Sequence, residues 1–252
     1  MYATCPKCAH VRGEADRFAQ QDRCPACGLI YAKYVPAGAP VPVRRASVEE
    51  MDERPAWSER LTEIAIDAPG GPSGMDLWFR AAFHALLVVY GVRLAAMDIP
   101  SWEMASSLIH GPMVPIHEFG HILFMPFGEF MMLLGGSLFQ VTLPLIFGGI
   151  FIVKRRDPFA ASVMLWWSAV AVMDVAPYMY DAYQPVHVLL TGRTGDTGAH
   201  DFIDVLGDLG LLNKAQQVGR MAHAFGVAML AASFAWGALV LLKLRATIRE
   251  NA

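Results

Sequence analysis

The chain has 252 residues, of which 55% are hydrophobic and 17% are charged, and its formal net charge is −3. Soluble domains carry about 25% charged residues, so this composition favours a membrane protein, and the weakly acidic balance gives no signal for nucleic-acid binding. The polar opening stretch does not resemble a secretory signal peptide. We therefore expect an all-α polytopic membrane bundle preceded by a small soluble head.

All four cysteines lie in the head, where two C-x2-C pairs are separated by 15 residues. Each pair forms a tight turn that directs two thiolates to one point, and two such turns complete a closed tetrahedral site. The sequence therefore predicts a zinc ribbon over residues 1–34. Its structural zinc would be bound by Cys5, Cys8, Cys24 and Cys27. Two disulfides are the alternative, which requires an extracellular head. The sequence does not identify a partner for the ribbon.

Residues 35–76 are predicted to be a linker. Its first part, 35–55, mixes Pro, Ala and charged residues and should be flexible. Residues 57–66 could form a short amphipathic helix at the membrane surface, and the Gly and Pro residues of 67–74 end it. The transmembrane domain is expected over 77–252.

Apolar segments follow one another through this domain and predict four to six helical passes, because a chain in lipid must satisfy its own backbone hydrogen bonds. The segments cover residues 77–97, 105–134, 137–153, 159–180 and 224–242. The second segment is too long for one perpendicular span. It belongs to a stretch, 104–153, that contains no Lys, Arg or Asp.

Basic residues predict the orientation of the spans. The clusters at 154–156 and 243–249 should face the cytoplasm, and reduced ribbon cysteines also favour a cytoplasmic head. One pass for each of the first three segments cannot satisfy both placements. A re-entrant element would remove the conflict, and the glycine-containing stretch 126–137 is the predicted one. We expect a lipid-embedded protein of the bacterial inner membrane with a cytoplasmic ribbon.

The second apolar segment contains the pattern H-E-x-x-H at residues 117–121. On a helix, His117 and His121 lie on one face and can bind a single zinc ion, with Glu118 beside the metal as a base for water. Each of these groups costs about 2–3 kcal/mol in an apolar layer if it has no partner, and a metal is the expected partner. A polar network without metal is the alternative.

A third ligand must come from elsewhere in the chain. Asp174 and Asp181 are seven residues apart and would share one helix face. His200 or Asp201, in the polar stretch between the last two spans, could instead fold back onto the metal. The remaining histidines, such as His110, are expected to be hydrogen-bonded packing or interface residues.

With these residues the chain resembles the site-2 protease family of intramembrane zinc metalloproteases. That family joins H-E-x-x-H to a later helix bearing N-x-x-P and an Asp-Gly pair whose aspartate completes the metal site. Here Pro177 matches the proline and Asp181 lies near the aspartate position. Asp174 replaces the asparagine, Ala182 replaces the glycine, and the spacing is one residue short. The resemblance implies Asp181 as third ligand and a re-entrant strand at 126–137 that holds extended substrate.

The predicted function is therefore hydrolysis of peptide bonds in a transmembrane or juxtamembrane protein substrate. Glu118 would be the catalytic base, and one catalytic zinc would accompany the structural zinc of the ribbon. A non-catalytic membrane scaffold or adaptor, with a structural intramembrane zinc and a partner-recruiting ribbon, is the alternative. A metal-ion transporter would need a second row of ligands along a pore.

Overall fold

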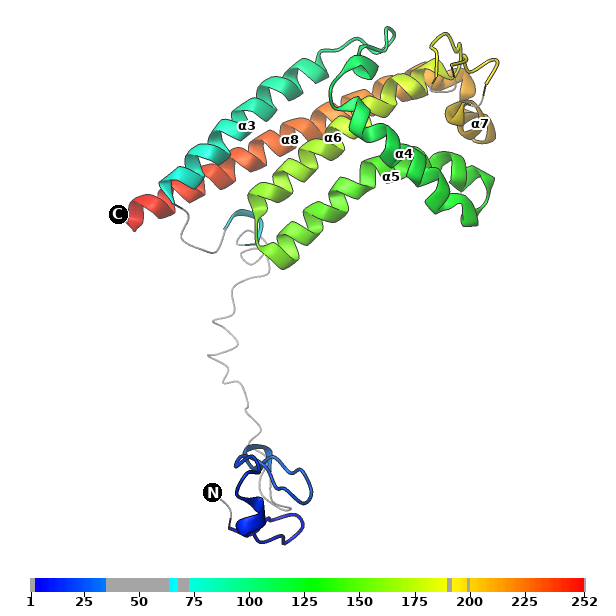
Figure 1. Cartoon of the computed structure of the whole chain (residues 1–252). Helices are drawn as coiled ribbons and strands as arrows, with labels where there is room; N and C mark the ends of the chain where they lie inside the picture. Colours follow the sequence, from blue (N-terminus) through cyan, green and yellow to red (C-terminus); the bar gives the residue numbers. More distant parts are fainter. Residues whose placement is uncertain (1–2, 35–63, 68–72, 190–191, 199, 252) are drawn as a thin grey trace, which may run out of the picture. The chain divides into compact units, whose positions relative to one another are not determined.

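The computed structural model describes residues 3–34, 64–67, 73–189, 192–198 and 200–251. The chain divides into two compact units, Met1–Arg54 and Pro55–Ala252, which are described separately (Figure 1). Most of the expected linker and of the surface helix at 57–66 lies outside the described residues, and only residues 64–66 of that stretch are described as helical.

The first unit is built from two similar turns, each of which holds one C-x2-C pair. The backbone N–H of Cys5 donates to the carbonyl of His10 at 2.8 Å, and that of Cys24 donates to the carbonyl of Leu29 at 2.9 Å. The short 3-10 turns η1 and η2 follow the first and second pairs; they span Glu14–Asp16 and Tyr31–Lys33.

The turns bring the four thiols together. Their sulfur atoms lie within 4.8 Å of one another. The Sγ–Sγ distances of 3.8 Å for Cys5 and Cys27 and 3.6 Å for Cys8 and Cys24 exceed the roughly 2.05 Å of a disulfide. All four cysteines are free thiols. The expected four-cysteine cluster of a zinc ribbon is confirmed.

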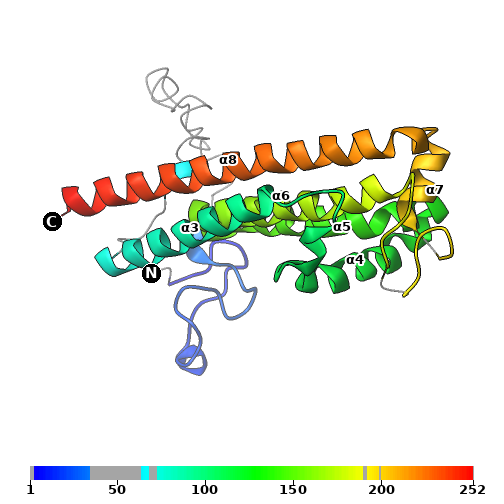
Figure 2. The same ribbon diagram turned by 90° about the horizontal axis from the view of Figure 1, so that it is seen from above.

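The second unit is all-helical. Among its described residues, four helices are long and apolar enough to cross a membrane. They are α3 (Gly74–Ala95), α5 (Glu129–Ile150, continued by η5, Phe151–Arg155), α6 (Pro158–Asp181) and α8 (Ala215–Glu250, preceded by η6, Leu212–Lys214). Figures 1 and 2 show them running side by side. The predicted helical bundle is confirmed, and the chain is an integral membrane protein by the length and composition of these helices.

Local sequence signals begin two of these helices. Ser73 and Asp76 form a capping box at the start of α3: the Ser73 hydroxyl accepts the Asp76 N–H at 3.1 Å, and the Asp76 carboxylate accepts the Ser73 N–H at 3.1 Å. At α6, the Asp157 carboxylate accepts the N–H of Ala160 at 3.1 Å, and Pro158 occupies the first helical position.

Helix α6 is the most buried of the four spans. Its side chains Trp166, Val170 and Met173 pack in one core with Leu94 of α3 and Leu230 of α8. Because lipid is as apolar as these side chains, close packing and hydrogen bonds hold such helices together. One such bond is donated by the Trp166 indole to the carbonyl of Leu87 at 3.1 Å.

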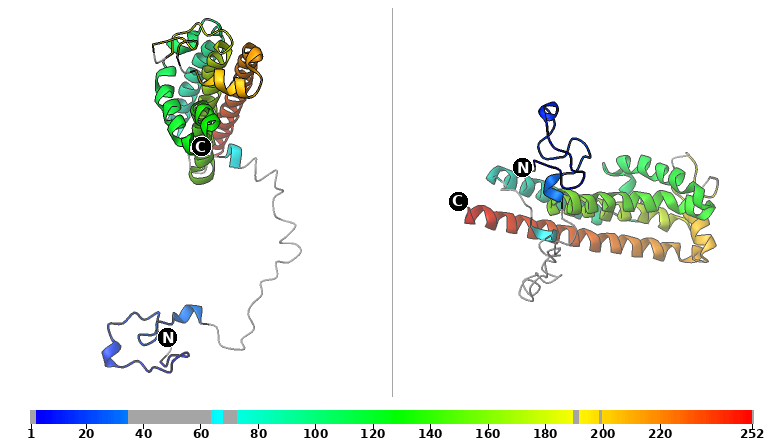
Figure 3. Two further views of the ribbon diagram at one scale, coloured as in Figure 1. Left: turned by 90° about the vertical axis from the view of Figure 1, so that its right-hand side faces the viewer. Right: turned by 90° about the horizontal axis from the view of Figure 1, so that it is seen from below.

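Both basic clusters lie at one end of the bundle. Arg80, near the start of α3, makes two hydrogen bonds of 2.9 and 3.2 Å with Asp157 at the junction of α5 and α6. Lys243 of α8 lies 3.7 Å from Asp67, just before α3. At the opposite end, His223 of α8 contacts the carbonyl of Ala95 at 3.1 Å. The right view of Figure 3 shows the last turns of α8 near the start of α3, at one end of the bundle.

The second apolar segment is not one membrane span: its last residues, 129–134, belong to α5, and the rest does not cross. It contains η3 (Glu103–Ser106), α4 (His110–Phe124) and η4 (Met125–Phe127). The 15 residues of α4 reach only about 22 Å, less than the roughly 30 Å of a bilayer core. After α3 ends, the chain folds back along α6, and α4 then returns it to the same end of the bundle, where α5 begins (Figure 1).

The expected re-entrant strand at 126–137 is wrong. Gly128 turns the chain with a φ of 96°, a conformation that favours glycine, and α5 begins at the next residue. Residues 129–137 are therefore the first turns of α5. Gly135 and Gly136 do not break this helix, because the backbone of an apolar span has no water to replace its helical hydrogen bonds. The chain returns to one face through α4 instead.

Candidate metal centre

Three side chains meet around one point beside α4. The Nε2 atoms of His117 and His121 lie 3.2 and 3.4 Å from the same oxygen, Oδ2 of Asp201. The ligand atoms of the three residues all lie within 4.8 Å of one another. Zinc bonds of 2.0–2.2 Å in a tetrahedron place ligand atoms roughly 3.3 Å apart, so this group has the dimensions of a metal site.

Asp201 reaches the histidines from α7 (Asp201–Asp208), of which it is the first residue. Its backbone N–H donates to the Tyr178 hydroxyl at 3.0 Å. The apolar side of α7, which includes Phe202 and Leu206, packs against α5 and the end of α6. Burial opposes ionisation of the Asp201 carboxyl, but the two imidazoles beside it outweigh burial and hold its pKa below the usual range. The ionised form is the one that binds a metal.

The structure corrects the expected third ligand: Asp201, not Asp181, lies beside the histidines. Asp181 is the last residue of α6 and is buried away from them. Its Oδ1 accepts the N–H of Val186 at 3.0 Å, and its Oδ2 lies 3.8 Å from Nε2 of His200. The His200 ring, fully buried, packs against Tyr178 with centroids 4.2 Å apart and is not part of the group. Because α6 ends at Asp181, the chain turns there and a later element supplies the carboxylate.

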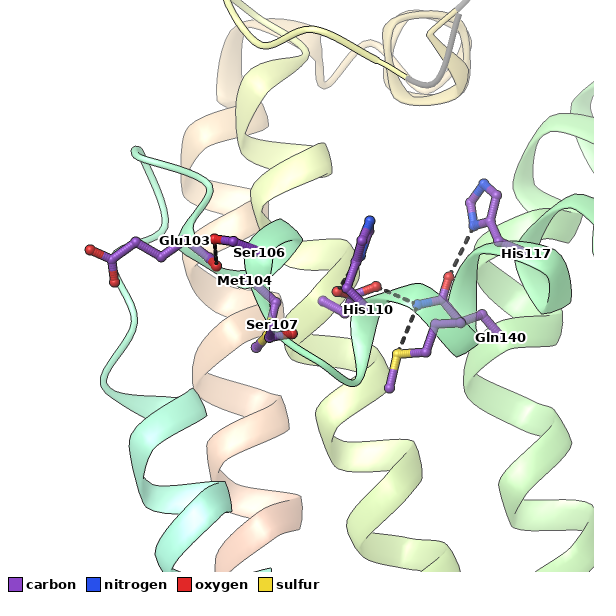
Figure 4. Close-up of polar contacts among 9 residues, drawn as sticks. Glu103, Met104, Ser106, Ser107, His110, His117 and Gln140 are labelled. Carbon is purple, nitrogen blue, oxygen red and sulfur yellow. Dashed lines mark hydrogen bonds and ion pairs between the residues drawn. The ribbon is translucent and has the colours of Figure 1, made fainter.

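The two histidines are each bonded through their other ring nitrogen. Nδ1 of His121 lies 2.8 Å from the carbonyl of Met132. Since a carbonyl only accepts, Nδ1 carries a proton, and the neutral ring, which is the form that binds a metal, then has its lone pair on Nε2. Nδ1 of His117 lies 3.1 Å from Oε1 of Gln140. Figure 4 shows this bond at the edge of a longer polar network that includes His110.

Asp174 belongs to that network and not to the metal group. Its Oδ2 accepts a hydrogen bond of 2.8 Å from Nε2 of Gln140, and its Oδ1 lies 2.8 Å from Nδ1 of His110. His110 is thus a hydrogen-bonded residue of the helix interface, as expected for the remaining histidines.

Glycine lets α4 and α5 approach closely at the site. A Cβ atom at Gly136 would lie 2.6 Å from Nε2 of His121 and 2.7 Å from Nε2 of His117. A Cβ at Gly120 would overlap the carbonyl oxygen of Gly135. A side chain at position 136 would therefore crowd both metal-binding nitrogens. Two imidazoles and one carboxylate are ligands that zinc prefers, and the absence of a side chain at Gly136 leaves room beside their binding atoms. The group therefore fits a zinc ion.

A cavity of about 470 Å³ adjoins the group. Its wall includes His117, His121 and Asp201, and it extends along α4 to His110. Glu118 also lines it, is exposed, and makes no hydrogen bond or ion pair with another described residue. A carboxylate without a partner, next to a metal group in a cavity, is placed to exchange protons with a bound molecule.

Sequence reasoning found part of this arrangement. The H-E-x-x-H spacing brought His117 and His121 together, and Asp201 stood among the alternatives for the third ligand. Gln140, the Met132 carbonyl and Gly136 were missed. One signal was available: Gln140 is the only amide side chain in residues 104–153. No family model, no curated protein and no solved structure matches the chain.

Proposed function

We propose that the chain is a zinc metalloprotease that hydrolyses peptide bonds within or near the membrane. One observation carries the proposal: two imidazoles and a carboxylate surround one point, and the free carboxylate of Glu118 lines the same cavity. The likeness to the site-2 protease family then rests on residues 117–121, because the third ligand comes from Asp201 in α7 and not from α6.

The depth of the site supports an intramembrane reaction. The apolar helix Glu129–Arg155 has 27 residues and is about 40 Å long. Gly136, which adjoins both metal-binding nitrogens, is seven residues into it, or about 10 Å from its start. The metal group therefore lies beside the apolar helix, about a quarter of its length from one end, where peptide bonds of a membrane-embedded substrate would be accessible.

In this proposal His117, His121 and Asp201 hold the zinc. When bound, the ion supplies a Lewis acid that acidifies water and polarises the carbonyl to be cleaved. Glu118 accepts the proton of the attacking water and passes it to the departing amine. The cavity wall also includes the buried apolar side chain of Val175.

Among the described residues, three and not four side chains of the types His, Cys, Asp and Glu surround the bundle site. A catalytic zinc keeps one position open, whereas a structural zinc is closed by four protein ligands. This count favours the enzyme over a scaffold braced by zinc. The only other group of this kind in the described chain is the four-cysteine cluster, for which we propose a structural zinc.

We also propose that the end of the bundle with both basic clusters faces the cytoplasm of a bacterial inner membrane. The Arg80–Asp157 and Lys243–Asp67 contacts bring the start of α3, the α5–α6 junction and the last turns of α8 to that end. Lys154, Arg155 and Arg156 lie in the same junction, so the positive-inside rule assigns one orientation to all of them. The ribbon precedes α3 and would share this side.

The test uses purified full-length protein in liposomes and a labelled single-span peptide whose helix is interrupted by Gly and Pro. Wild-type protein should cleave it, and Glu118→Gln should retain both zinc ions but lose cleavage by at least about 100-fold, the usual contribution of a general base. If Glu118→Gln cleaves like wild type while zinc remains bound, the assigned role is refuted. Wild-type protein that binds one zinc only, in the ribbon, would refute the enzyme.

A further inference from the structure

We infer that Gln140 is a positioning residue that, oriented by Asp174, fixes the metal-binding tautomer of His117. The inference rests on the metal site proposed above, but it concerns metal affinity and not cleavage. It assigns a role to the polar network between α4, α5 and α6, which the proposed reaction does not use directly.

The centre of the network, Gln140 and Asp174, is buried between the helices. Gln140 is 3% exposed, and the side chain of Asp174 is 6% exposed. Polar groups in such a place are costly unless each is hydrogen-bonded, which limits how the network can be arranged. Figure 4 shows Gln140 between His117 on one side and the network around His110 on the other.

The order of donors follows from Asp174. A carboxylate only accepts, so the group of Gln140 that lies 2.8 Å from Oδ2 of Asp174 must be its NH₂. The amide oxygen of Gln140 then faces Nδ1 of His117 at 3.1 Å. An amide oxygen also only accepts, and therefore Nδ1 of His117 must carry the proton.

The consequence appears at the other nitrogen of His117. With the proton on Nδ1, a neutral imidazole presents the lone pair of Nε2 to the metal. His121 obtains the same tautomer from the backbone carbonyl of Met132, which cannot rotate. The Gln140 amide, in contrast, can rotate by 180°. Asp174 is needed to hold it in the orientation whose oxygen faces His117.

His110 completes the arrangement by donating from Nδ1 to the second oxygen of Asp174 at 2.8 Å. Each oxygen of Asp174 thus has a donor, from α5 on one side and α4 on the other. Because groups bonded to zinc-binding histidines typically change metal affinity 10- to 100-fold, the network should be measurable in zinc binding.

The experiment measures zinc affinity of full-length protein in detergent by competition with a chromogenic chelator. The bundle zinc is identified as the ion that His121→Ala fails to bind. Gln140→Met keeps the length of the side chain but removes the acceptor, and should weaken the bundle zinc by about 10- to 100-fold. Asp174→Leu leaves the Gln140 amide free to rotate and should weaken it by about 10-fold.

Two further variants separate positioning from general stability. In Asp174→Asn the oxygen of the new amide can accept from Gln140 and its NH₂ can donate to Nδ1 of His110, because the His110 ring can carry its proton on Nε2 instead. Zinc affinity should therefore stay within about threefold of wild type. Ser168→Ala removes another buried hydrogen bond, the 2.9 Å bond to the carbonyl of Val141, and should leave zinc affinity unchanged.

The inference is overturned if Gln140→Met and Asp174→Leu bind the bundle zinc within threefold of wild type, if Ser168→Ala weakens it equally, or if wild-type protein has no bundle zinc. A different result would separate the two proposals: Gln140→Met and Asp174→Leu bind the bundle zinc more weakly, but the wild-type protein cleaves no peptide. That result would support the positioning role and refute the proposed protease. The zinc measurement thus distinguishes the two proposals.

Discussion

Replacing Gly136 by alanine is the sharpest perturbation of the metal centre, because it adds one atom beside the two zinc-binding nitrogens. The new Cβ would lie 2.6 and 2.7 Å from Nε2 of His121 and His117, whereas ordinary contact begins near 3.4 Å. The nitrogens must therefore retreat by about 0.7–0.8 Å, the difference between 3.4 Å and those distances.

Zinc sites tolerate errors of only about 0.2 Å in their bonds, so this shift is several times too large. We expect the bundle zinc to bind at least about 100-fold more weakly, which corresponds to about 2.7 kcal/mol, and cleavage to be lost with it. The helix itself should not suffer, because alanine is favoured over glycine in a helix by about 1 kcal/mol.

Zinc affinity is measured by chelator competition, and thermal unfolding without added zinc reports the stability of the fold. Gly149→Ala is the matched control: it lies on the same helix, and a Cβ there would meet no atom within 4 Å. It should keep wild-type zinc affinity. Wild-type affinity in Gly136→Ala, or an equal loss in both variants, would refute the geometry of the site.

Three other outcomes are expected. Asp201→Ala should lose the bundle zinc, whereas Asp181→Ala should keep it and have a lower melting temperature, because Asp181 accepts a hydrogen bond from Val186 and does not belong to the metal group. The reverse pattern in metal analysis would make Asp181 the ligand. Cys24→Ser should reduce bound zinc from two ions to one by mass spectrometry and leave cleavage intact, and a loss of both ions would contradict independent sites. Gly120→Val should displace α4 from α5, because the valine side chain would meet the backbone of Gly135 and Gly136. Circular dichroism should show lower thermal stability, and zinc analysis should show loss of the bundle zinc. An unchanged protein would argue against the close helix contact.

The sequence alone determined the features that depend on residues close together in the chain. Two C-x2-C turns predict four converging thiols, and H-E-x-x-H predicts two imidazoles on one helix face, because a turn or a helix sets those directions locally. Apolar length predicted helical membrane spans for the same reason, since each helix in lipid satisfies its own hydrogen bonds.

The tertiary structure alone decided which carboxylate joins the histidines. Asp201 lies 84 residues after His117, and its position depends on where α6 ends and on how α7 packs against α5 and α6. It also decided that Gly128 turns the chain into α5, so that the segment expected to hold extended substrate is helical. Contacts between distant residues follow from the packing of whole helices, and no spacing along the chain encodes them.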